Sequence, residues 1–274
     1  MINNYNSLRI RLGTILKTRE PDLIEFDNRH QGYLKKYFLL STLFVLSLFS
    51  GQSIFAQGPA NDYTFATSTG ATLDPMTGST LIGAAPNDDT PYAASSIGFN
   101  FVYETTTYTQ FSASPDGFMR LGGTTASSQF SNALTSATNV PKLAPLWDDL
   151  ALGSLAGGGS VRVLTTGTAP NRICKIQWFV TAPRATGGAA NSTFQVWLYE
   201  TTNVIEFRYG TVGIAPSSSV GIVGSTATNF QSVTLSSNTA SNVTANNSNS
   251  VAPASGRMYT FTPPVILTPP NCAT

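Results

Sequence analysis

The dominant pattern in this chain is a series of short runs in which apolar and polar residues alternate, each ended by Gly, Pro, Asn or Asp. Within residues 172–181, Cys174, Ile176, Trp178 and Val180 share one face, and that face is wholly apolar. Alternation with a period of two is typical of a strand that is buried on one side. The pattern therefore predicts a half-buried strand here, with Trp178 in the core.

Similar runs predict strands along most of the chain after residue 57. Ser114-Pro115-Asp116-Gly117 has proline second and glycine last, which favours a tight hairpin turn, and residues 201–203 link a second predicted hairpin. Residues 127–137 are predicted to form one short helix. About ten to twelve strands at short spacing, without βαβ signals, predict an all-β fold, an antiparallel and jelly-roll-like β-sandwich. The predicted strands are residues 63–65, 97–102, 108–113, 117–121, 161–164, 172–181, 193–200, 204–209, 220–223, 232–235 and 258–261.

Residues 142–150 break the pattern of half-apolar strands. An apolar run there contains Pro145 and Trp147 and leads directly into the adjacent carboxylates Asp148 and Asp149. This order predicts a buried strand that reaches the surface in an acidic turn.

The composition of the chain divides it into four parts. Residues 1–32 form a polar extension, 33–56 a signal peptide, 57–262 the β-sandwich domain, and 263–274 a proline-rich linker to a further module expected after Thr274. Within the domain, residues 236–256 are rich in Ser, Asn and Thr and have little apolar surface to offset the entropy lost on ordering. We expect a mobile loop or a long hairpin tip there.

The signal peptide is inferred from a basic flank at 33–36, an apolar stretch at 37–50 and a small-residue exit at Ala56. A membrane span needs about 20 apolar residues, so this stretch is too short for a stable span. We expect a helical signal and a secreted or cell-surface protein.

Charge and histidine content restrict the chemistry after the signal. Charged residues make up 11% of the chain, against about 25% in ordinary proteins, and residues 57–274 hold eight basic and ten acidic residues. A strongly basic face is therefore absent from the sequence, and we exclude nucleic-acid binding. The only histidine, His30, precedes the signal, so the exported part has no histidine for a Ser-His-Asp mechanism or a His-ligated metal.

Asp148 and Asp149 are the first candidates for a binding site. Together with Asp116, and with Asp88 and Asp89 as further oxygen donors, they could bind calcium, which takes six to eight oxygen ligands. No other cofactor is expected. Because adjacent residues of a strand point to opposite faces, both carboxylates can face one ion only at a turn or bulge. The alternative, which we favour, is that they accept backbone N–H bonds in a turn after Trp147.

Aromatic and paired acidic residues suggest two further kinds of site. Trp147 and Trp197 could stack against sugars, and Trp197 is expected to be the more exposed of the two. Glycoside hydrolysis would need two carboxylates about 5 to 10 Å apart across a cleft. The candidates for such a pair are Asp116, Asp148, Asp149, Glu200 and Glu206.

The two cysteines differ in their surroundings. Cys174 lies on an apolar strand face and is predicted to be a buried thiol, whereas Cys272 lies beyond the proline linker and is expected to pair outside this sequence.

Several segments resemble the nidogen-like (NIDO) extracellular domain, over roughly residues 95–235. The resemblance implies an extracellular, adhesive or scaffolding module and carries over no catalytic residues. Residues 256–273 resemble module junctions in Gram-negative surface proteins of the type IX secretion class. The segments that carry the NIDO resemblance are residues 99–101, 114–118, 144–149, 191–196, 205–209 and 220–222.

The leading functional prediction is a secreted, non-catalytic β-sandwich module of a bacterial cell-surface protein, adhesive or structural, with an extracellular protein or glycan as its partner. The alternative is a carbohydrate-binding module that uses Trp197 or Trp147. The third hypothesis is a carboxylate-based glycoside hydrolase.

Overall fold

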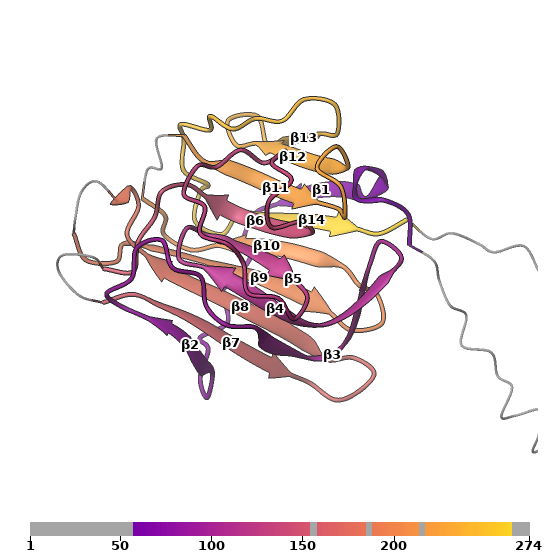
Figure 1. Cartoon of the computed structure of the whole chain (residues 1–274), viewed down its shortest axis with the longest axis horizontal. Helices are drawn as coiled ribbons and strands as arrows, with labels where there is room; N and C mark the ends of the chain where they lie inside the picture. The colour runs from indigo at the N-terminus through magenta and orange to yellow at the C-terminus, as the bar shows by residue number, and fades with distance from the viewer. Residues whose placement is uncertain (1–56, 154–157, 185–187, 214–216, 265–274) are drawn as a thin grey trace, which may run out of the picture. The chain divides into compact units, whose positions relative to one another are not determined.

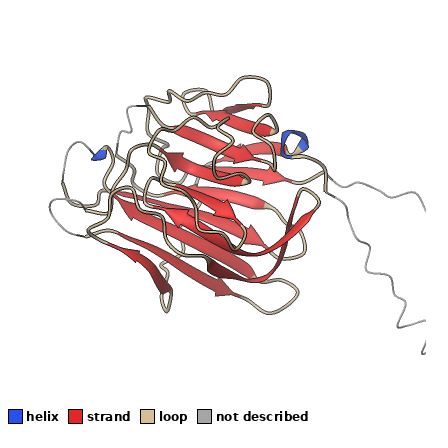
Figure 2. Cartoon of the chain, viewed as in Figure 1, coloured by secondary structure: helices blue, strands red, loops and turns tan. Residues whose placement is uncertain are grey.

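The computed structural model describes residues 57–153, 158–184, 188–213 and 217–264. These residues form two antiparallel sheets of seven strands each, packed face to face as a sandwich (Figure 1). Strands and loops make up the described chain, which contains no α-helix and has a short 3-10 turn, η1 (Ala60–Asp62), before the first strand (Figure 2). The predicted all-β antiparallel sandwich is confirmed.

The first sheet contains both ends of the domain, because its edge strand β1 pairs with the last strand, β14. From β7 to β10 its strands follow one another along the chain as a meander. The strand order is β1 (Thr64–Ser68), β14 (Met258–Thr262), β10 (Ile205–Tyr209), β9 (Ser192–Tyr199), β8 (Ile173–Val180), β7 (Ser160–Thr166) and β2 (Thr80–Ala84).

The second sheet is built from a meander of β3 to β6 and a second run of β11 to β13. The chain thus crosses between the sheets after β2, β6, β10 and β13. The strand order is β13 (Thr239–Ser241), β12 (Phe230–Thr234), β11 (Ser219–Val223), β6 (Lys142–Trp147), β5 (Phe118–Leu121), β4 (Thr106–Ser114) and β3 (Ser95–Tyr103).

Both predicted hairpins are present. β4 pairs with β5 across the turn at 114–117, where the Gly117 N–H donates to the Ser114 carbonyl at 3.2 Å. Gly117 has a φ of +80°, and a Cβ there would lie 1.9 Å from the Leu146 carbonyl oxygen. Glycine is therefore required by both the backbone conformation and the close approach of β6. The second hairpin joins β9 and β10.

The main core fills the space between the sheets, and the predicted apolar face of β8 lies in it. Cys174, Ile176, Trp178 and Val180 are all fully buried. The Trp178 ring stacks on Phe194, and its Nε1–H donates to the Ser114 carbonyl of the opposite sheet at 2.8 Å. This hydrogen bond lets the indole be buried without leaving its polar atom unpaired.

A smaller core lies on the outer face of the second sheet, under residues 122–141. It contains Trp147 and Phe118, whose rings are 5.0 Å apart. The helix predicted at 127–137 is wrong, because this covering segment is a loop. Hydrogen bonds from side chains replace those of a helix. The Asn139 side chain accepts from the Ser127 N–H and donates to the Ser127 carbonyl, and Trp147 Nε1–H donates to the Gln129 carbonyl at 3.0 Å.

Of the two alternatives for residues 236–256, a mobile loop or a long hairpin tip, the structure shows a hairpin at the start of the segment. This segment contains β13, which pairs with β12, and the buried residue Asn249. The Asn249 side chain accepts from the Leu235 N–H and donates to the Ser218 and Val233 carbonyls, at 2.8 to 3.1 Å. Hydrogen bonds from amide side chains thus attach a segment that has little apolar surface.

The predicted extension, the signal peptide and Cys272 lie outside the described residues. Within the described ranges, no helix is long and apolar enough to cross a membrane.

Candidate metal centre

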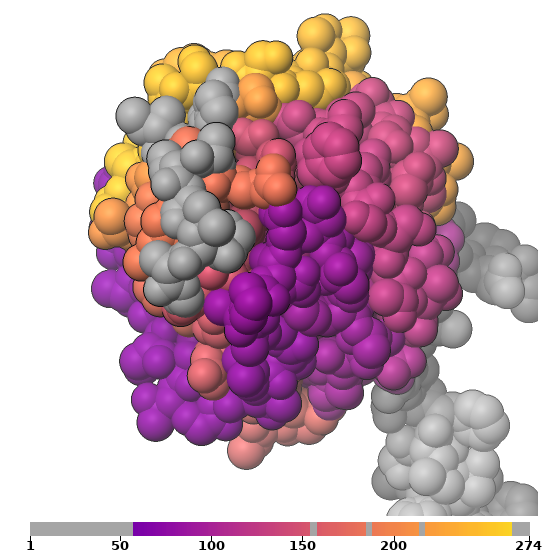
Figure 3. Space-filling view, turned by 60° about the vertical axis from the view of Figure 1, so that its left-hand side comes forward, coloured from indigo at the N-terminus to yellow at the C-terminus, as the bar shows by residue number. Residues whose placement is uncertain are grey.

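Three segments that are far apart in the sequence meet at one end of the sandwich. They are the β2–β3 connection with Asp88 and Asp89, the β4–β5 turn with Asp116, and the residues that follow β6, which include Asp149. Backbone hydrogen bonds hold them together: the Asp148 N–H donates to the Asp116 carbonyl at 3.3 Å, and residues 87 and 152 form an antiparallel bridge. Figure 3 turns this end towards the viewer, and the early, purple part of the chain lies there beside the pink and orange parts.

The carboxylates of Asp88, Asp89 and Asp149 form a cluster at this junction. Their ligand oxygens all lie within 4.8 Å of one another, and the three residues are half-buried. The guanidinium of Arg184, which follows β8, forms ion pairs with Asp88 and with Asp149, the latter at 3.4 Å. One arginine thus neutralises part of a three-carboxylate cluster.

Asp116, in the β4–β5 turn, is a fourth carboxylate at this end of the sandwich. Its side chain is fully buried, and Oδ2 accepts from the Ser114 hydroxyl at 3.0 Å. Burial, together with the charges of Asp89 and Asp149, raises the pKa of Asp116 to about 8, against the lowering effect of hydrogen bonds from Ser114 and from the Leu150 backbone.

Oxygen atoms without a hydrogen-bond partner are concentrated here. The described residues contain ten buried side-chain N or O atoms that lack such a partner, and four of them are carboxylate oxygens of this site. Buried polar atoms are normally paired, so a group of unpaired ones needs a physical explanation. The four atoms are Oδ1 of Asp88, Asp89, Asp116 and Asp149.

Asp148 does not take part in this group. Its Oδ2 accepts from the Ser217 N–H at 3.2 Å, and its Oδ1 accepts from the Asp149 N–H at 2.9 Å. The two adjacent aspartates therefore have different surroundings, as expected for neighbours at a strand end. Asp148 accepts backbone N–H bonds, whereas Asp149 joins residues from distant segments. Arg184 has no counterpart in the sequence analysis, because no local pattern connects it to these acids.

Neither tryptophan of the predicted sugar platform offers an open ring. Trp147 is fully buried in the smaller core, with Lys142 Nζ 4.8 Å from its ring centre. Trp197 is half-buried on the outer face of β9, and the Arg208 guanidinium lies 3.6 Å from its ring centre. A sugar would have to displace this cation to stack there.

The two glutamates proposed for hydrolysis lie in ion pairs on the first sheet. Glu200 accepts from Arg172, whose hydrogen bond lowers the pKa of Glu200. Glu206 pairs with Arg208 and accepts from the Tyr199 hydroxyl. Neither glutamate belongs to the acidic cluster. Cys174 is free and buried, and burial raises the pKa of its thiol to about 12, so the prediction of a buried thiol is confirmed.

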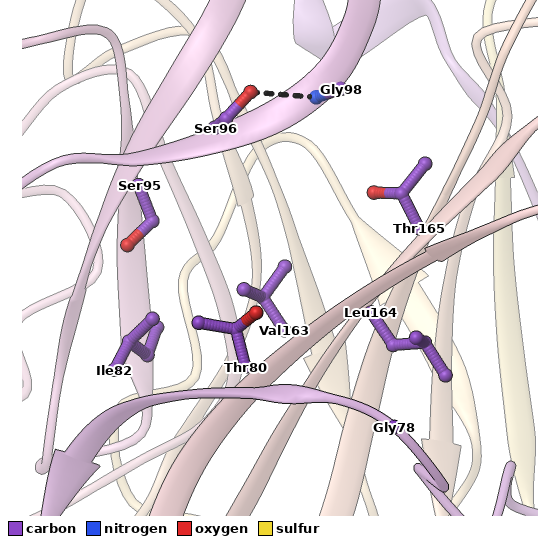
Figure 4. A pocket seen from close by; sticks show the side chains of 9 residues that line it. All are labelled: Gly78, Thr80, Ile82, Ser95, Ser96, Gly98, Val163, Leu164 and Thr165. Atoms are coloured by element: carbon purple, nitrogen blue, oxygen red, sulfur yellow. Dashed lines mark hydrogen bonds between the residues drawn. The ribbon is translucent and has the colours of Figure 1, made fainter.

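A separate cavity of about 450 Å³ opens between β2, β3 and β7. Its lining consists of glycine, hydroxyl and aliphatic side chains, and in Figure 4 these lie around an open space crossed by no side chain. The Ser96 hydroxyl already accepts from the Gly98 N–H at 3.0 Å. The lining carries no charged group, so this cavity offers a ligand few polar contacts.

Comparison with known proteins identifies the family. A family model described as NIDO related matches residues 62–263. The chain belongs to the NIDO-related family. The match runs from before β1 to the end of β14, so the NIDO-related domain comprises both sheets and extends beyond residues 95–235, where the resemblance is seen in the sequence. No curated protein and no solved structure matches the chain.

Proposed function

We propose that this NIDO-related domain acts outside the cell as a non-catalytic β-sandwich module with an adhesive or structural role. The observation that carries the proposal is the family match over the whole two-sheet domain, because nidogen-like domains are typically extracellular and non-catalytic. The signal-like segment at 33–56 supports export. The proposed setting is a modular surface protein of a Gram-negative bacterium, exported by the type IX route.

The arrangement of the acids supports a non-catalytic role. A general acid needs a raised pKa and must reach its substrate. Asp116 has the raised pKa, but its side chain is fully buried beneath the turn. Glu200 is held in the ionised form by Arg172. Burial also raises the pKa of the half-buried Asp149, but that carboxylate is paired with Arg184. The carboxylate with the largest rise, Asp116, thus has no access to a glycosidic bond.

The test is a binding and hydrolysis screen with the exported chain. Labelled protein is applied to a glycan panel, immobilised matrix proteins and whole cells, with the heat-unfolded protein as control. Saturable binding of the folded protein alone would support an adhesive role. Uniform lack of binding would restrict the role to a structural one, and release of reducing sugar from any glycan would refute the non-catalytic assignment.

A further inference from the structure

The chain enters and leaves this domain at one point. A Cβ added to Gly58 would lie 2.8 Å from Cγ of Pro264, so the residues before η1 touch the residues after β14. β1 and β14 lie side by side next to this point, with Thr64 paired to Thr262 (Figure 1). The two ends of the domain are therefore neighbours on one edge of the first sheet. Close ends of this kind allow a domain to be inserted within a longer chain.

The antiparallel pairing of β1 with β14 decides how a pull on the two ends is transmitted. Hydrogen bonds in an antiparallel pair run perpendicular to the strands. The start of β1 and the end of β14 lie at the same end of the pair, so a pull that separates them acts along the hydrogen bonds. The Thr64–Thr262 pair is then loaded first, and the other four registered pairs follow in turn. Each bond is weak by itself, so sequential opening never meets the resistance of the whole strand.

β1 is more weakly held than β14. It is the edge strand of its sheet and pairs with β14 alone, whereas β14 also pairs with β10. Four of the five residues of β1 are exposed. Phe65 is half-buried, and its ring lies 5.6 Å from that of Tyr259 and 5.5 Å from that of Phe261. Tension on the two ends would therefore remove β1 while β14 stays in the sheet.

A short anchor precedes β1 and is loaded before it. The Ala60 N–H donates to Glu104 Oε1 at 3.2 Å, which attaches η1 to the β3–β4 turn. The Asn61 N–H donates to Asn229 Oδ1 at 2.8 Å, just before β12. Tyr63 follows and is buried in the core. These contacts succeed one another along the chain, so a pull from the N-terminal side meets them one at a time.

We infer that this domain is carried as a side branch of its chain and does not serve as a load-bearing spacer. A spacer that transmits tension needs its ends at opposite poles, so that neighbouring strands are sheared and many hydrogen bonds resist together. Here both ends leave from one point, so the domain adds little length to the chain and tension would open it strand by strand. The inference rests on the proposed extracellular role, and of the two roles proposed there it favours the adhesive one.

The position of the ends also determines which part of the surface is displayed. Ile205 follows the β9–β10 turn and pairs with Phe261, so the ends lie at the same end of the sandwich as that turn. Antiparallel neighbours reverse direction, so the connection after β8 lies at the opposite end, where Arg184 pairs with Asp88 and Asp149. The loops at that end therefore face away from the point of attachment.

Force spectroscopy on the full chain tests the inference. Handles are attached to cysteines, and Cys174 does not react because it is buried, which raises the pKa of its thiol to about 12. The natural geometry uses Pro59→Cys, at an exposed position before η1, together with the chain's own Cys272. The matched control uses Thr69→Cys with the same Cys272. Residue 69 is equally exposed and lies just after β1, so only the loaded end of that strand changes.

The two geometries load the same pair of strands in different directions. In the control, the pull runs along the strands and shears β1 against β14, so all five registered pairs resist together. The natural geometry should therefore unfold at a force at least about twofold lower than the control.

Tyr63→Phe gives a second readout that global stability alone would not produce. It removes the hydroxyl that accepts from the Glu104 N–H at 3.4 Å and donates to Gln57 Oε1 at 2.9 Å. This anchor lies in the load path of the natural geometry only, because the control handle at residue 69 follows it. The variant should lower the unfolding force in the natural geometry by a larger factor than in the control.

Two results would overturn the inference. One is an unfolding force in the natural geometry that equals or exceeds that of the control, which would assign the domain a load-bearing role. The other is an equal fractional effect of Tyr63→Phe in both geometries, which would show that the anchor before β1 does not carry the load. Failure of the glycan and matrix screen would leave the measured forces unchanged, so the two proposals can fail separately.

Discussion

The replacement Gly117→Ala provides a sharp test of how closely the two sides of the acidic site approach each other. Gly117 has a φ of +80°, which costs about 1–2 kcal/mol for a residue with a side chain. The new Cβ would also lie 1.9 Å from the Leu146 carbonyl oxygen, an impossible contact. Either the turn or β6 must move by more than about 1 Å, and overpacking of this kind costs about 1–3 kcal/mol.

The movement also affects two backbone hydrogen bonds. The Leu146 N–H donates to the Gly117 carbonyl at 3.4 Å, and the Asp148 N–H donates to the Asp116 carbonyl at 3.3 Å. Each is worth about 0.5–1.5 kcal/mol. The combined loss in unfolding free energy is about 3–8 kcal/mol, which corresponds to a Tm lower by at least about 6 °C.

Gly70→Ala is the matched control. Gly70 has a φ of +79°, but a Cβ there would meet nothing within 4 Å. It should lose only the conformational term, about 1–2 kcal/mol. Urea unfolding followed by tryptophan fluorescence reports both variants, since Trp147 and Trp178 are buried. Equal destabilisation of the two variants would refute the reasoning, because it would show that the close contact with β6 has no energetic consequence.

Three further predictions concern other parts of the fold. Burial lowers the pKa of Lys142 to about 8, so the unfolded chain binds more protons than the folded chain between pH 8 and 10.5. Relative to Lys142→Met, the unfolding free energy of the wild type should therefore rise by up to about 3 kcal/mol over that range. Urea-unfolding free energies of the two proteins that change in parallel with pH would contradict this. Asn249→Ala removes three side-chain hydrogen bonds to buried backbone groups and should cost about 2–5 kcal/mol, whereas Asn242→Ala, which loses one exposed hydrogen bond, should cost less than about 1 kcal/mol in the same denaturation assay. Arg184→Gln removes the cation that pairs with Asp88 and Asp149, so repulsion within the acidic cluster should lower the unfolding free energy by up to about 1 kcal/mol at low salt and by less at high salt, and an effect that does not change with salt would contradict this.

Most strands of this fold are predictable because their signals are local, although β2 and β13 are not among the predicted strands. Four alternate apolar residues identify the buried face of β8, and one tetrad identifies the β4–β5 turn. The errors in two loop segments have a common cause. In residues 127–137 and 236–256, order comes from the amides of Asn139 and Asn249, which bond distant backbone groups. Neither apolar periodicity nor composition reports such bonds.

The acidic site was predictable only in part. Asp148 and Asp149 stand out in the sequence, but which of the two joins other acids depends on the exact residue at which β6 ends. Asp149 meets Asp88, 61 positions earlier, and Arg184, 35 positions later. Those separations carry no local signal, because they are set by the order of strands in two sheets.

The connectivity nevertheless explains why these residues meet. Successive antiparallel strands reverse direction, so every second connection lies at the same end of the sandwich. The connections after β2, β4, β6 and β8 carry Asp88 and Asp89, Asp116, Asp149, and Arg184, which therefore all lie at one end. The connections after β7 and β9 lie at the opposite end, where Arg172 pairs with Glu200. Once the strands are numbered correctly, charged residues on connections at the same end of the sandwich become candidates for contact. Charged residues on connections at opposite ends are excluded as partners. This rule separates the Arg172–Glu200 pair from the acidic cluster and brings Asp88 and Asp149 together.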